Sequence, residues 1–238
     1  MLRAEAAWLA DRLEELPADD LSPLLSIGSG DARLRTTLQP WIEGKVYAPL
    51  ARRGVRVLHH DLEATAGVDV AGDLTDSAFL GSLEQLEVRS VMCCNVLEHV
   101  PDPVQVAAAI ERVVAPGGYL LVTVPVRYPY HPGPIDTFFR PTVEELRLLF
   151  PTLTARTSAE IRCESLIAYL LASPTKWASL AHGVRTLAGP DSYPHAPPRP
   201  PFRETARMTV LSTAVSAIVF RASSRTTGHH WATIWATP

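Results

Sequence analysis

The chain has 238 residues, of which 47% are hydrophobic and 20% charged, and its formal net charge is −3. This composition is typical of a globular protein with a substantial core and excludes a disordered chain. The length favours one domain with additions over two independent domains. Lysine and arginine are scattered along the chain, so we expect no nucleic-acid partner.

The N-terminus and the cysteines indicate the compartment. No apolar run reaches the roughly 18 residues that a membrane-spanning helix needs, so no membrane span is expected. Acids occur in residues 1–16, where a signal peptide would be cationic and then apolar, and we therefore expect a cytoplasmic protein. The cysteines include the adjacent pair Cys93 and Cys94 in an apolar run and lack the spacing of a disulfide framework or a zinc site.

Hydrophobic periodicity predicts alternating strands and helices. An N-terminal helix is expected over 4–16, ending before Pro17. The expected strands, each short and apolar, are 24–27, 55–58, 68–70, 88–94 and 119–124. The expected helices between them are 34–53, 77–86 and 103–115. This alternation predicts an α/β, doubly wound and mostly parallel sheet with helices on both faces.

The second half of the chain is less regular. Thr142 and Glu145 form a capping-box signal for a helix that stops at Phe150. A helical tract over 164–188, broken by Pro174, could be core, a lid over a pocket, or a dimer or membrane-surface contact. A proline-rich connector is expected over 190–201 and a last strand over 214–220.

We interpret residues 1–238 as a single domain with three parts. These parts are an N-terminal helix in 1–20, a core in 22–150 and a C-terminal part in 152–238. The C-terminal part is expected to hold the helical insertion before the last strand.

A glycine turn, Gly28-Ser29-Gly30, directly follows the first predicted strand. Glycine suits such a turn because a ligand can touch the backbone where a Cβ would collide, and because these turns often need a positive φ. Taken alone, the pair is equally consistent with a plain strand-to-helix turn.

Polar residues follow the next strands at the same edge of the sheet. Asp61 ends the second strand, where a carboxylate can accept hydrogen bonds from both ribose hydroxyls of a nucleoside. Asp73 follows the third strand, where it could meet an adenine amino group. The fourth strand runs into Asn95-Val96-Leu97-Glu98-His99-Val100, and the fifth is preceded by Pro116-Gly117-Gly118.

This ordered set of motifs resembles class I S-adenosylmethionine-dependent methyltransferases over roughly residues 22–150. The run from Tyr130 to Thr142 is similar to a bacterial subgroup, of the type 11 kind, associated with small-molecule and glycan biosynthesis. The resemblance implies a Rossmann-like sheet of about seven strands, S-adenosyl-L-methionine as cofactor and a small-molecule acceptor.

The resemblance also assigns residues to the cofactor. It implies that the methionine part lies at the glycine turn, the ribose on Asp61, the adenine near Asp73, and the sulfonium near Asn95. The residues expected to bind the cofactor are Ser26, Gly28, Ser29, Gly30, Asp61, Leu62, Asp73, Leu74, Asn95 and Val96.

One position departs from the family pattern. Many members carry an acid two residues before the first glycine, where it helps to hold the cofactor's amino group, and this chain has Ser26 there. A neutral hydroxyl binds an ammonium less strongly, so either Asp31 or water takes the place of the acid, or affinity is reduced.

Histidines at the same edge could serve as a base. A hydroxyl acceptor must lose its proton, and histidine accepts protons near neutral pH. His99 follows the fourth strand and His131 the fifth, so both are catalytic candidates. Glu98 and His99 could instead simply cap the helix that begins near Pro103.

The loop after the fifth strand carries the candidate substrate-binding residues Tyr130, Asp136 and Arg140. Asp136 and Arg140 could clamp a polar substrate or merely pair with each other to order the loop. No metal site is expected, since His59 and His60 lack further ligands nearby.

Methyl transfer to oxygen, or less readily nitrogen, of a metabolite, natural product or sugar is the leading hypothesis. Alkyl transfer or cyclisation with the same cofactor, and a binding module without turnover, are the alternatives. A nicotinamide-dependent oxidoreductase would fit the glycine turn and the acid, but the turn lacks a third glycine and the later motifs go unexplained. The sequence leaves a homodimer open.

Overall fold

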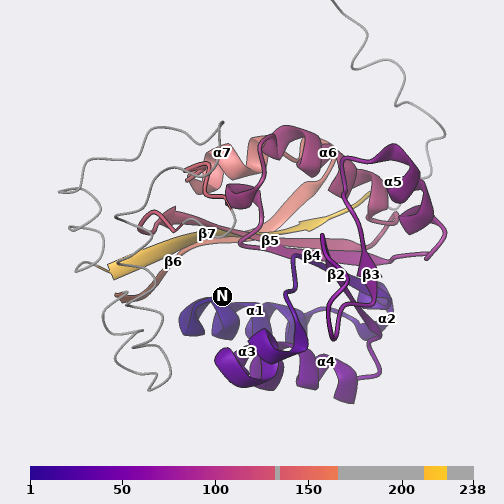
Figure 1. Ribbon diagram of the computed structural model, residues 1–238, viewed down its shortest axis with the longest axis horizontal. Helices are drawn as coiled ribbons and strands as arrows, with labels where there is room; N and C mark the ends of the chain where they lie inside the picture. The colour runs from indigo at the N-terminus through magenta and orange to yellow at the C-terminus, as the bar shows by residue number, and fades with distance from the viewer. Residues whose placement is uncertain (132–134, 166–211, 224–238) are drawn as a thin grey trace, which may run out of the picture.

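The computed structural model describes residues 1–131, 135–165 and 212–223. They form one open, seven-stranded sheet with the order β3-β2-β1-β4-β5-β7-β6 (Figure 1). The strands are β1 Leu24–Ile27, β2 Val57–Asp61, β3 Val70–Ala71, β4 Ser90–Cys94, β5 Tyr119–Arg127, β6 Thr154–Ser165 and β7 Ser212–Arg221. The first five pair in parallel, whereas β7 is antiparallel to β5 and β6. The predicted Rossmann-like α/β fold is confirmed.

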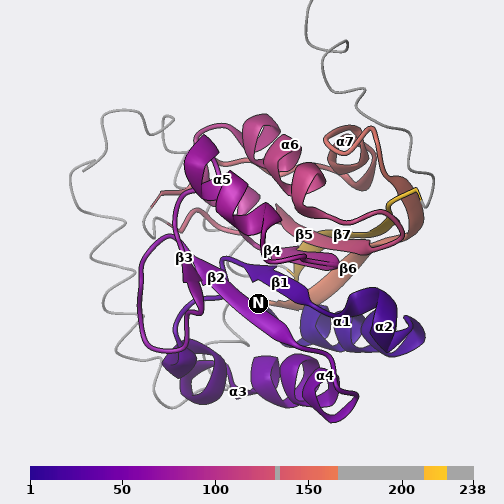
Figure 2. The same cartoon turned by 90° about the vertical axis from the view of Figure 1, so that its right-hand side faces the viewer.

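Helices cover both faces of the sheet (Figures 1 and 2). One face carries α5 Ser77–Glu84, α6 Pro103–Val113 and α7 Val143–Leu148. The other carries α1 Arg3–Glu15, α2 Ala18–Leu21, α3 Pro40–Ile42 and α4 Ala48–Arg52, with the π-helical turns η1 Leu34–Leu38 and η2 Glu43–Tyr47. The 3-10 turn η3 Leu97–His99 follows β4.

The core lies in two layers, one on each face of the central strands. Successive side chains of a strand point to opposite faces, and in β5 Leu120 and Val122 join the layer under α5 and α6. Leu121 joins the layer under α1 and α4. Central strands covered on both faces must be apolar throughout, which is why β1, β4 and β5 read as continuous hydrophobic runs in the sequence.

Side-chain caps fix where the helices begin. The Asp102 carboxylate accepts from the backbone nitrogens of Val104 and Gln105 at 2.9 and 3.0 Å, and it caps α6. The capping role suggested for Glu98 and His99 is therefore wrong. The predicted capping box of α7 is confirmed, with Thr142 and Glu145 exchanging bonds of 2.8 and 3.2 Å.

The helix expected over 34–53 is broken into short helical pieces. Pro40 begins α3 and Pro49 lies in the first turn of α4. The helical path breaks at Gln39, whose φ of −133° and ψ of 63° lie outside the helical region directly before Pro40. From Pro40 to Arg52 the chain stays helical, and the π-helical turn η2 precedes Pro49, where a regular α-helix would lose a backbone hydrogen bond and meet the proline ring.

The C-terminal part departs from the sequence prediction at β6, which the hydrophobic pattern did not reveal. This strand lies at the edge of the sheet and its exposed and half-buried side chains alternate, so it lacks a long apolar run. Residues 164 and 165 belong to β6 rather than to a helix. The remainder of the predicted helical tract and the proline-rich connector lie outside the described residues, whereas the last strand is confirmed as β7.

Within the described ranges, no helix combines the length and the apolarity needed to cross a membrane.

Candidate cofactor and acceptor site

The sheet changes direction between β1 and β4. The chain passes from β1 to β2 and β3 on one side, and β4 and β5 pair on the other. In open α/β sheets such a switch point leaves a crevice at the carboxyl ends of the strands, and ligands bind there. Gly28 directly follows β1 and Asn95 directly follows β4, so both stand at this crevice.

Two cavities meet at the crevice. The β3-side cavity, of about 570 Å³, is lined by Asp61, Leu62, Asp73, Leu74, Val96 and residues that begin α6. The β5-side cavity, of about 360 Å³, is lined among others by Glu5, Ser26, Ser29, Tyr47, Glu98, Tyr128 and His131. Ile27, Gly28, Asn95 and His99 line both. The cavities are therefore neighbours with a common wall at the ends of β1 and β4.

The glycine turn needs its glycines for reasons within the protein itself. Gly28 has a φ of 62° and Gly30 a φ of 66°, a backbone region that residues other than glycine rarely adopt. A Cβ on Gly28 would overlap the Val96 side chain, and one on Gly30 would overlap Leu34. The glycine turn therefore packs closely against Val96, which follows the carboxyl end of β4.

Asp61 is tied to the glycine turn. Its Oδ2 accepts from the Gly30 backbone nitrogen at 2.8 Å, and its Oδ1 accepts from the Leu62 nitrogen at 2.8 Å. Asp73 Oδ1 accepts from both the nitrogen and the hydroxyl of Thr75 at 2.8 Å. Both carboxylates line the β3-side cavity, one at each of two adjacent strand ends.

A buried arginine that the sequence analysis missed supports the same turn. The Arg35 guanidinium is 4% exposed and donates to the carbonyl oxygens of Gly30 and Gly67, the latter at 2.7 Å. Its Nη1 also lies 3.3 Å from the Ser29 hydroxyl. The sequence placed Arg35 inside an ordinary helix, where an arginine is normally solvated, so no local signal could have revealed this role.

The neutral residue at position 26 has a neutral partner. The Ser26 hydroxyl lies 2.8 Å from the Tyr47 hydroxyl, and burial raises the pKa of Tyr47 well above its ordinary value. The Asp31 Oδ1 accepts from the Leu34 nitrogen at 2.6 Å, and Asp31 is not among the residues that line the β5-side cavity.

The acid in the β5-side cavity comes from α1. Glu5 is fully buried, and its Oε1 accepts from Asn95 Nδ2 at 2.7 Å and from the Thr123 hydroxyl at 2.6 Å. Its Oε2 accepts from the Leu2 nitrogen at 2.9 Å. In the sequence Glu5 is one of several acids within residues 1–16, and nothing in the local pattern marks it as a cavity residue.

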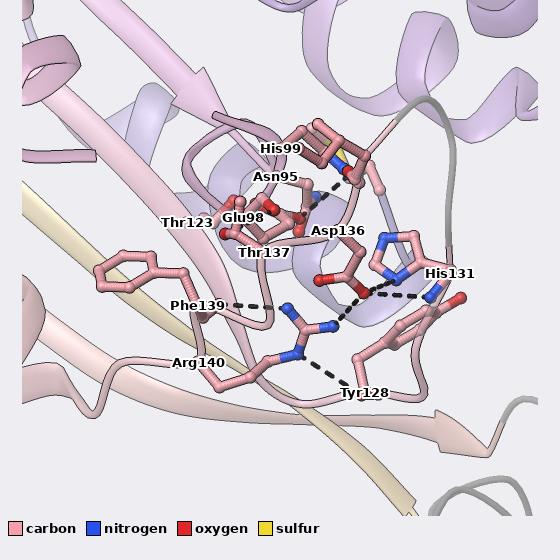
Figure 3. Close-up of polar contacts among 12 residues, drawn as sticks. Asn95, Glu98, His99, Thr123, Tyr128, His131, Asp136, Thr137, Phe139 and Arg140 are labelled. Atoms are coloured by element: carbon pink, nitrogen blue, oxygen red, sulfur yellow. Dashed lines mark hydrogen bonds and ion pairs between the residues drawn. The ribbon is translucent and has the colours of Figure 1, made fainter. Parts of the chain in front are cut away.

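His99, Glu98 and His131 gather in the β5-side cavity (Figure 3). Glu98 is fully buried, and among the described residues neither of its carboxylate oxygens has a hydrogen-bond partner. Burial raises the pKa of Glu98 to about 8. His99 Nε2 lies 3.7 Å from Glu98 Oε1, and burial lowers the pKa of His99. The rings of His99 and His131 lie 4.9 Å apart, edge to face.

Asp136 and Arg140 pair with each other (Figure 3). Asp136 is fully buried, and its Oδ2 lies 2.7 Å from Arg140 Nη2 and 3.1 Å from His131 Nδ1. Burial by itself raises the pKa of Asp136, but the bonds from His131 and Arg140 outweigh burial and hold that pKa well below its usual value. This geometry matches the alternative in which the pair orders its loop. Tyr130 is half-buried in the same loop, and Tyr128 rather than Tyr130 lines the β5-side cavity.

Part of the chain is similar to known methyltransferases. Residues 42–122 match the family model described as a methyltransferase domain. A ubiquinone biosynthesis O-methyltransferase from Ralstonia nicotianae is 38% identical over 72 residues, which are 30% of this chain and 29% of the relative. Another, from Alkalilimnicola ehrlichii, is 28% identical over 142 residues, covering 53% of this chain and 58% of the relative. The matched region thus spans less than two thirds of either relative.

A solved structure has the same fold. It is described as a sarcosine dimethylglycine methyltransferase from Galdieria sulphuraria, with a TM-score of 0.54 and 14% identity, and the match covers 93% of this chain and 85% of that one.

The switch-point crevice, with an acid after β2 and glycines after β1, defines an α/β domain of the class that binds nucleoside cofactors. With the methyltransferase-domain match over residues 42–122 and the shared fold, it supports a class I S-adenosylmethionine-dependent methyltransferase domain.

Proposed function

We propose that this protein transfers the methyl group of S-adenosylmethionine to an oxygen of a small molecule held in the β5-side cavity. The observation that supports this most directly is the common wall of the two cavities at Gly28 and Asn95. A cofactor lying across that wall would place its nucleoside in one cavity and its reactive sulfonium at the entrance to the other.

The β3-side cavity suits the nucleoside. Asp61 would accept hydrogen bonds from the ribose hydroxyls, and such charge-assisted bonds are stronger than neutral ones. Asp73 and Leu74 would contact the adenine, one through its carboxylate and the other through an apolar side chain that is 6% exposed. Leu62 and Val96, which line the same cavity, would pack against the nucleoside.

The glycine turn and Glu5 suit the methionine end. Ser26, Gly28 and Ser29 line the β5-side cavity beside Glu5. A carboxylate offers about four lone-pair sites, and Asn95, Thr123 and the Leu2 nitrogen occupy three of those on Glu5. The remaining site would accept from the cofactor's ammonium, in place of the acid that the family carries at position 26.

The chemistry requires alignment more than activation of the methyl donor. The acceptor oxygen attacks the methyl carbon, the carbon–sulfur bond breaks, and its electron pair stays on sulfur to give S-adenosylhomocysteine. A hydroxyl acceptor also releases its proton. His99 or His131 would take it, since burial lowers the pKa of His99 and keeps that imidazole neutral and able to accept.

Oxygen is proposed as the acceptor atom because both curated relatives are O-methyltransferases of a biosynthetic pathway. Calorimetry with S-adenosylhomocysteine should first show binding, and a panel of phenols, catechols and sugars should then release S-adenosylhomocysteine with a methylated product. Binding without release across the panel would favour a module without turnover. A product with a group other than methyl would favour different chemistry with the same cofactor.

The base is tested separately in single-turnover assays of His99→Ala and His131→Ala. The variant that removes the base should slow methyl transfer and leave cofactor affinity unchanged. If neither variant slows the step, positioning alone carries the reaction.

A further inference from the structure

Three side chains of the metal-binding type converge on one wall of the β5-side cavity. Glu98, His99 and His131 each offer a ligand atom, and within the described chain these atoms all lie within 4.8 Å of one another. Glu98 and His99 come from η3 after β4, and His131 comes from the loop after β5. Two adjacent strand ends therefore bring the three together, although His131 is far from Glu98 and His99 in the sequence.

The buried Glu98 carboxylate accepts no hydrogen bond from the part of the chain that the structure describes. Its side chain has no solvent exposure, and neither oxygen accepts a hydrogen bond from the described residues. An isolated buried carboxylate is costly unless it is paired, bound to a metal or kept protonated. His99 Nε2 lies 3.7 Å from Glu98 Oε1, which is too long for a direct hydrogen bond.

Both imidazoles are held as metal-binding imidazoles usually are. His99 Nδ1 contacts the Ile135 carbonyl oxygen, an acceptor, so Nδ1 carries the proton and Nε2 keeps its lone pair on the side of Glu98. His131 Nδ1 lies 3.1 Å from the Asp136 carboxylate and 3.1 Å from the Pro129 carbonyl oxygen, both acceptors, so Nδ1 is the donating nitrogen and Nε2 is the one left for a metal ion. Metal-bound histidines characteristically donate their other N–H to a carboxylate or a carbonyl in this way.

A second layer of contacts fixes the His131 support. Asp136 Oδ2 is held by Arg140 Nη2 at 2.7 Å (Figure 3). Asp136 Oδ1 accepts from the Phe138 nitrogen at 2.8 Å. Asp136 itself is fully buried, so the carboxylate that orders this loop is also held in place behind His131, as carboxylates behind metal-bound histidines are.

We propose that Glu98, His99 and His131 bind a divalent transition-metal ion at the wall of the β5-side cavity. Two imidazoles and one carboxylate favour ions such as Zn²⁺, Mn²⁺, Fe²⁺ or Co²⁺ over Ca²⁺ and Mg²⁺, which prefer oxygen ligands. Three protein ligands leave coordination positions open for a further ligand from the cavity. The sequence predicted no metal site, because it does not show that His131 lies beside Glu98 and His99 in the fold.

The role of the ion rests on the proposed function, whereas ion binding does not. An acceptor hydroxyl bound to the ion would lose its proton to solvent more readily, as metal-bound water does. Its oxygen would then form the bond to the methyl carbon while the carbon–sulfur bond breaks toward sulfur. The ion would keep its oxidation state throughout, and with the ion bound His99 and His131 would serve as its ligands, so that the proton would go to solvent instead of to either imidazole.

The test uses the full chain, stripped with a chelator, titrated with MnCl₂ by electron paramagnetic resonance and with ZnCl₂ by calorimetry. One site per chain is expected. Glu98→Gln and His131→Asn should each weaken Mn²⁺ binding by about tenfold or more, since each removes a ligand. Glu111→Gln is the matched control, because Glu111 is a buried acid on α6 whose partner is Thr152.

Calorimetry with S-adenosylhomocysteine on the same samples separates the two proposals. Absence of Mn²⁺ and Zn²⁺ binding in a protein that binds S-adenosylhomocysteine overturns the metal site and leaves the methyltransferase proposal intact. Metal binding that Glu98→Gln and His131→Asn leave unchanged also overturns it. Metal binding without any cofactor binding would instead count against the proposed function. Circular dichroism checks that each variant is folded, and line broadening of histidine resonances by Mn²⁺ in the unmodified protein gives a readout that needs no variant.

Discussion

The side-chain amide of Asn95 donates to Oε1 of Glu5 at 2.7 Å, across 90 positions of sequence. Asn95 has a φ of 54°, a left-handed conformation that asparagine tolerates better than most residues. The bond fastens α1 to the carboxyl end of β4. The N-terminal helix therefore supplies part of the wall of the β5-side cavity.

Glu5→Gln should weaken binding of S-adenosylhomocysteine by about 1 to 2 kcal/mol, because it removes the negative charge proposed to face the ammonium while keeping an acceptor oxygen. Calorimetry should show no comparable loss for 5′-methylthioadenosine, which lacks the amino-acid part. Glu14→Gln, an exposed acid on the same helix, is the control. Equal losses for both ligands would contradict the proposed role of Glu5.

Asp61→Asn should weaken cofactor binding by on the order of 1 to 3 kcal/mol, through loss of charge-assisted bonds to the ribose and of the tie to Gly30. Glu63→Gln, an exposed acid close by in the chain, should leave affinity unchanged in the same calorimetric titration. An unaltered dissociation constant for Asp61→Asn would refute the assignment of the ribose to this carboxylate.

Arg35→Met should lower the free energy of unfolding by about 2 to 4 kcal/mol, since the carbonyl oxygens of Gly30 and Gly67 would lose their buried charged donor. Urea denaturation measures this change. Arg33→Met, at an exposed neighbouring position, should alter stability by less than about 0.5 kcal/mol. Equal effects of the two substitutions would show that Arg35 does not support the turn.

Stability should fall as the pH drops from about 6.5 to about 4, in part because of His59. Burial, followed by the charge of Arg35, lowers the pKa of His59 to about 4, so the unfolded chain takes up a proton in this window while the folded chain does not. The depressed pKa therefore costs nothing above pH 6.5 and destabilises the fold progressively below it. The ring is partly exposed and packs edge to face on Tyr47 at 4.6 Å.

The check for this titration is urea denaturation of His59→Gln and of the unmodified protein at pH 7.5 and pH 5. The unmodified protein should lose more stability than the variant on acidification, by on the order of 1 kcal/mol once solvent screening is allowed for. A difference between the two proteins that stays constant with pH would exclude His59 as a contributor.

The sequence alone determined the parallel part of the sheet and its ligand edge. Central strands must be apolar on both faces, so β1, β4 and β5 were visible as hydrophobic runs, and the carboxyl ends of parallel strands must share one edge. The sequence alone therefore placed Gly28, Asp61 and Asn95 together at that edge of the sheet. Local capping chemistry likewise fixed the start of α7 at Thr142.

Only the tertiary structure decided which distant residues complete the cavities. The burial of Glu5 and Arg35 leaves no periodic signal in the sequence, and neither does the proximity of Glu98 to His131. Burial of a charged side chain depends on partners that other elements contribute. The edge strand β6 was equally hidden, since a half-exposed strand needs no apolar run. Hydrophobic periodicity reports which face of an element is buried, whereas paired charges and hydrogen bonds report contacts that exist only once the elements have packed.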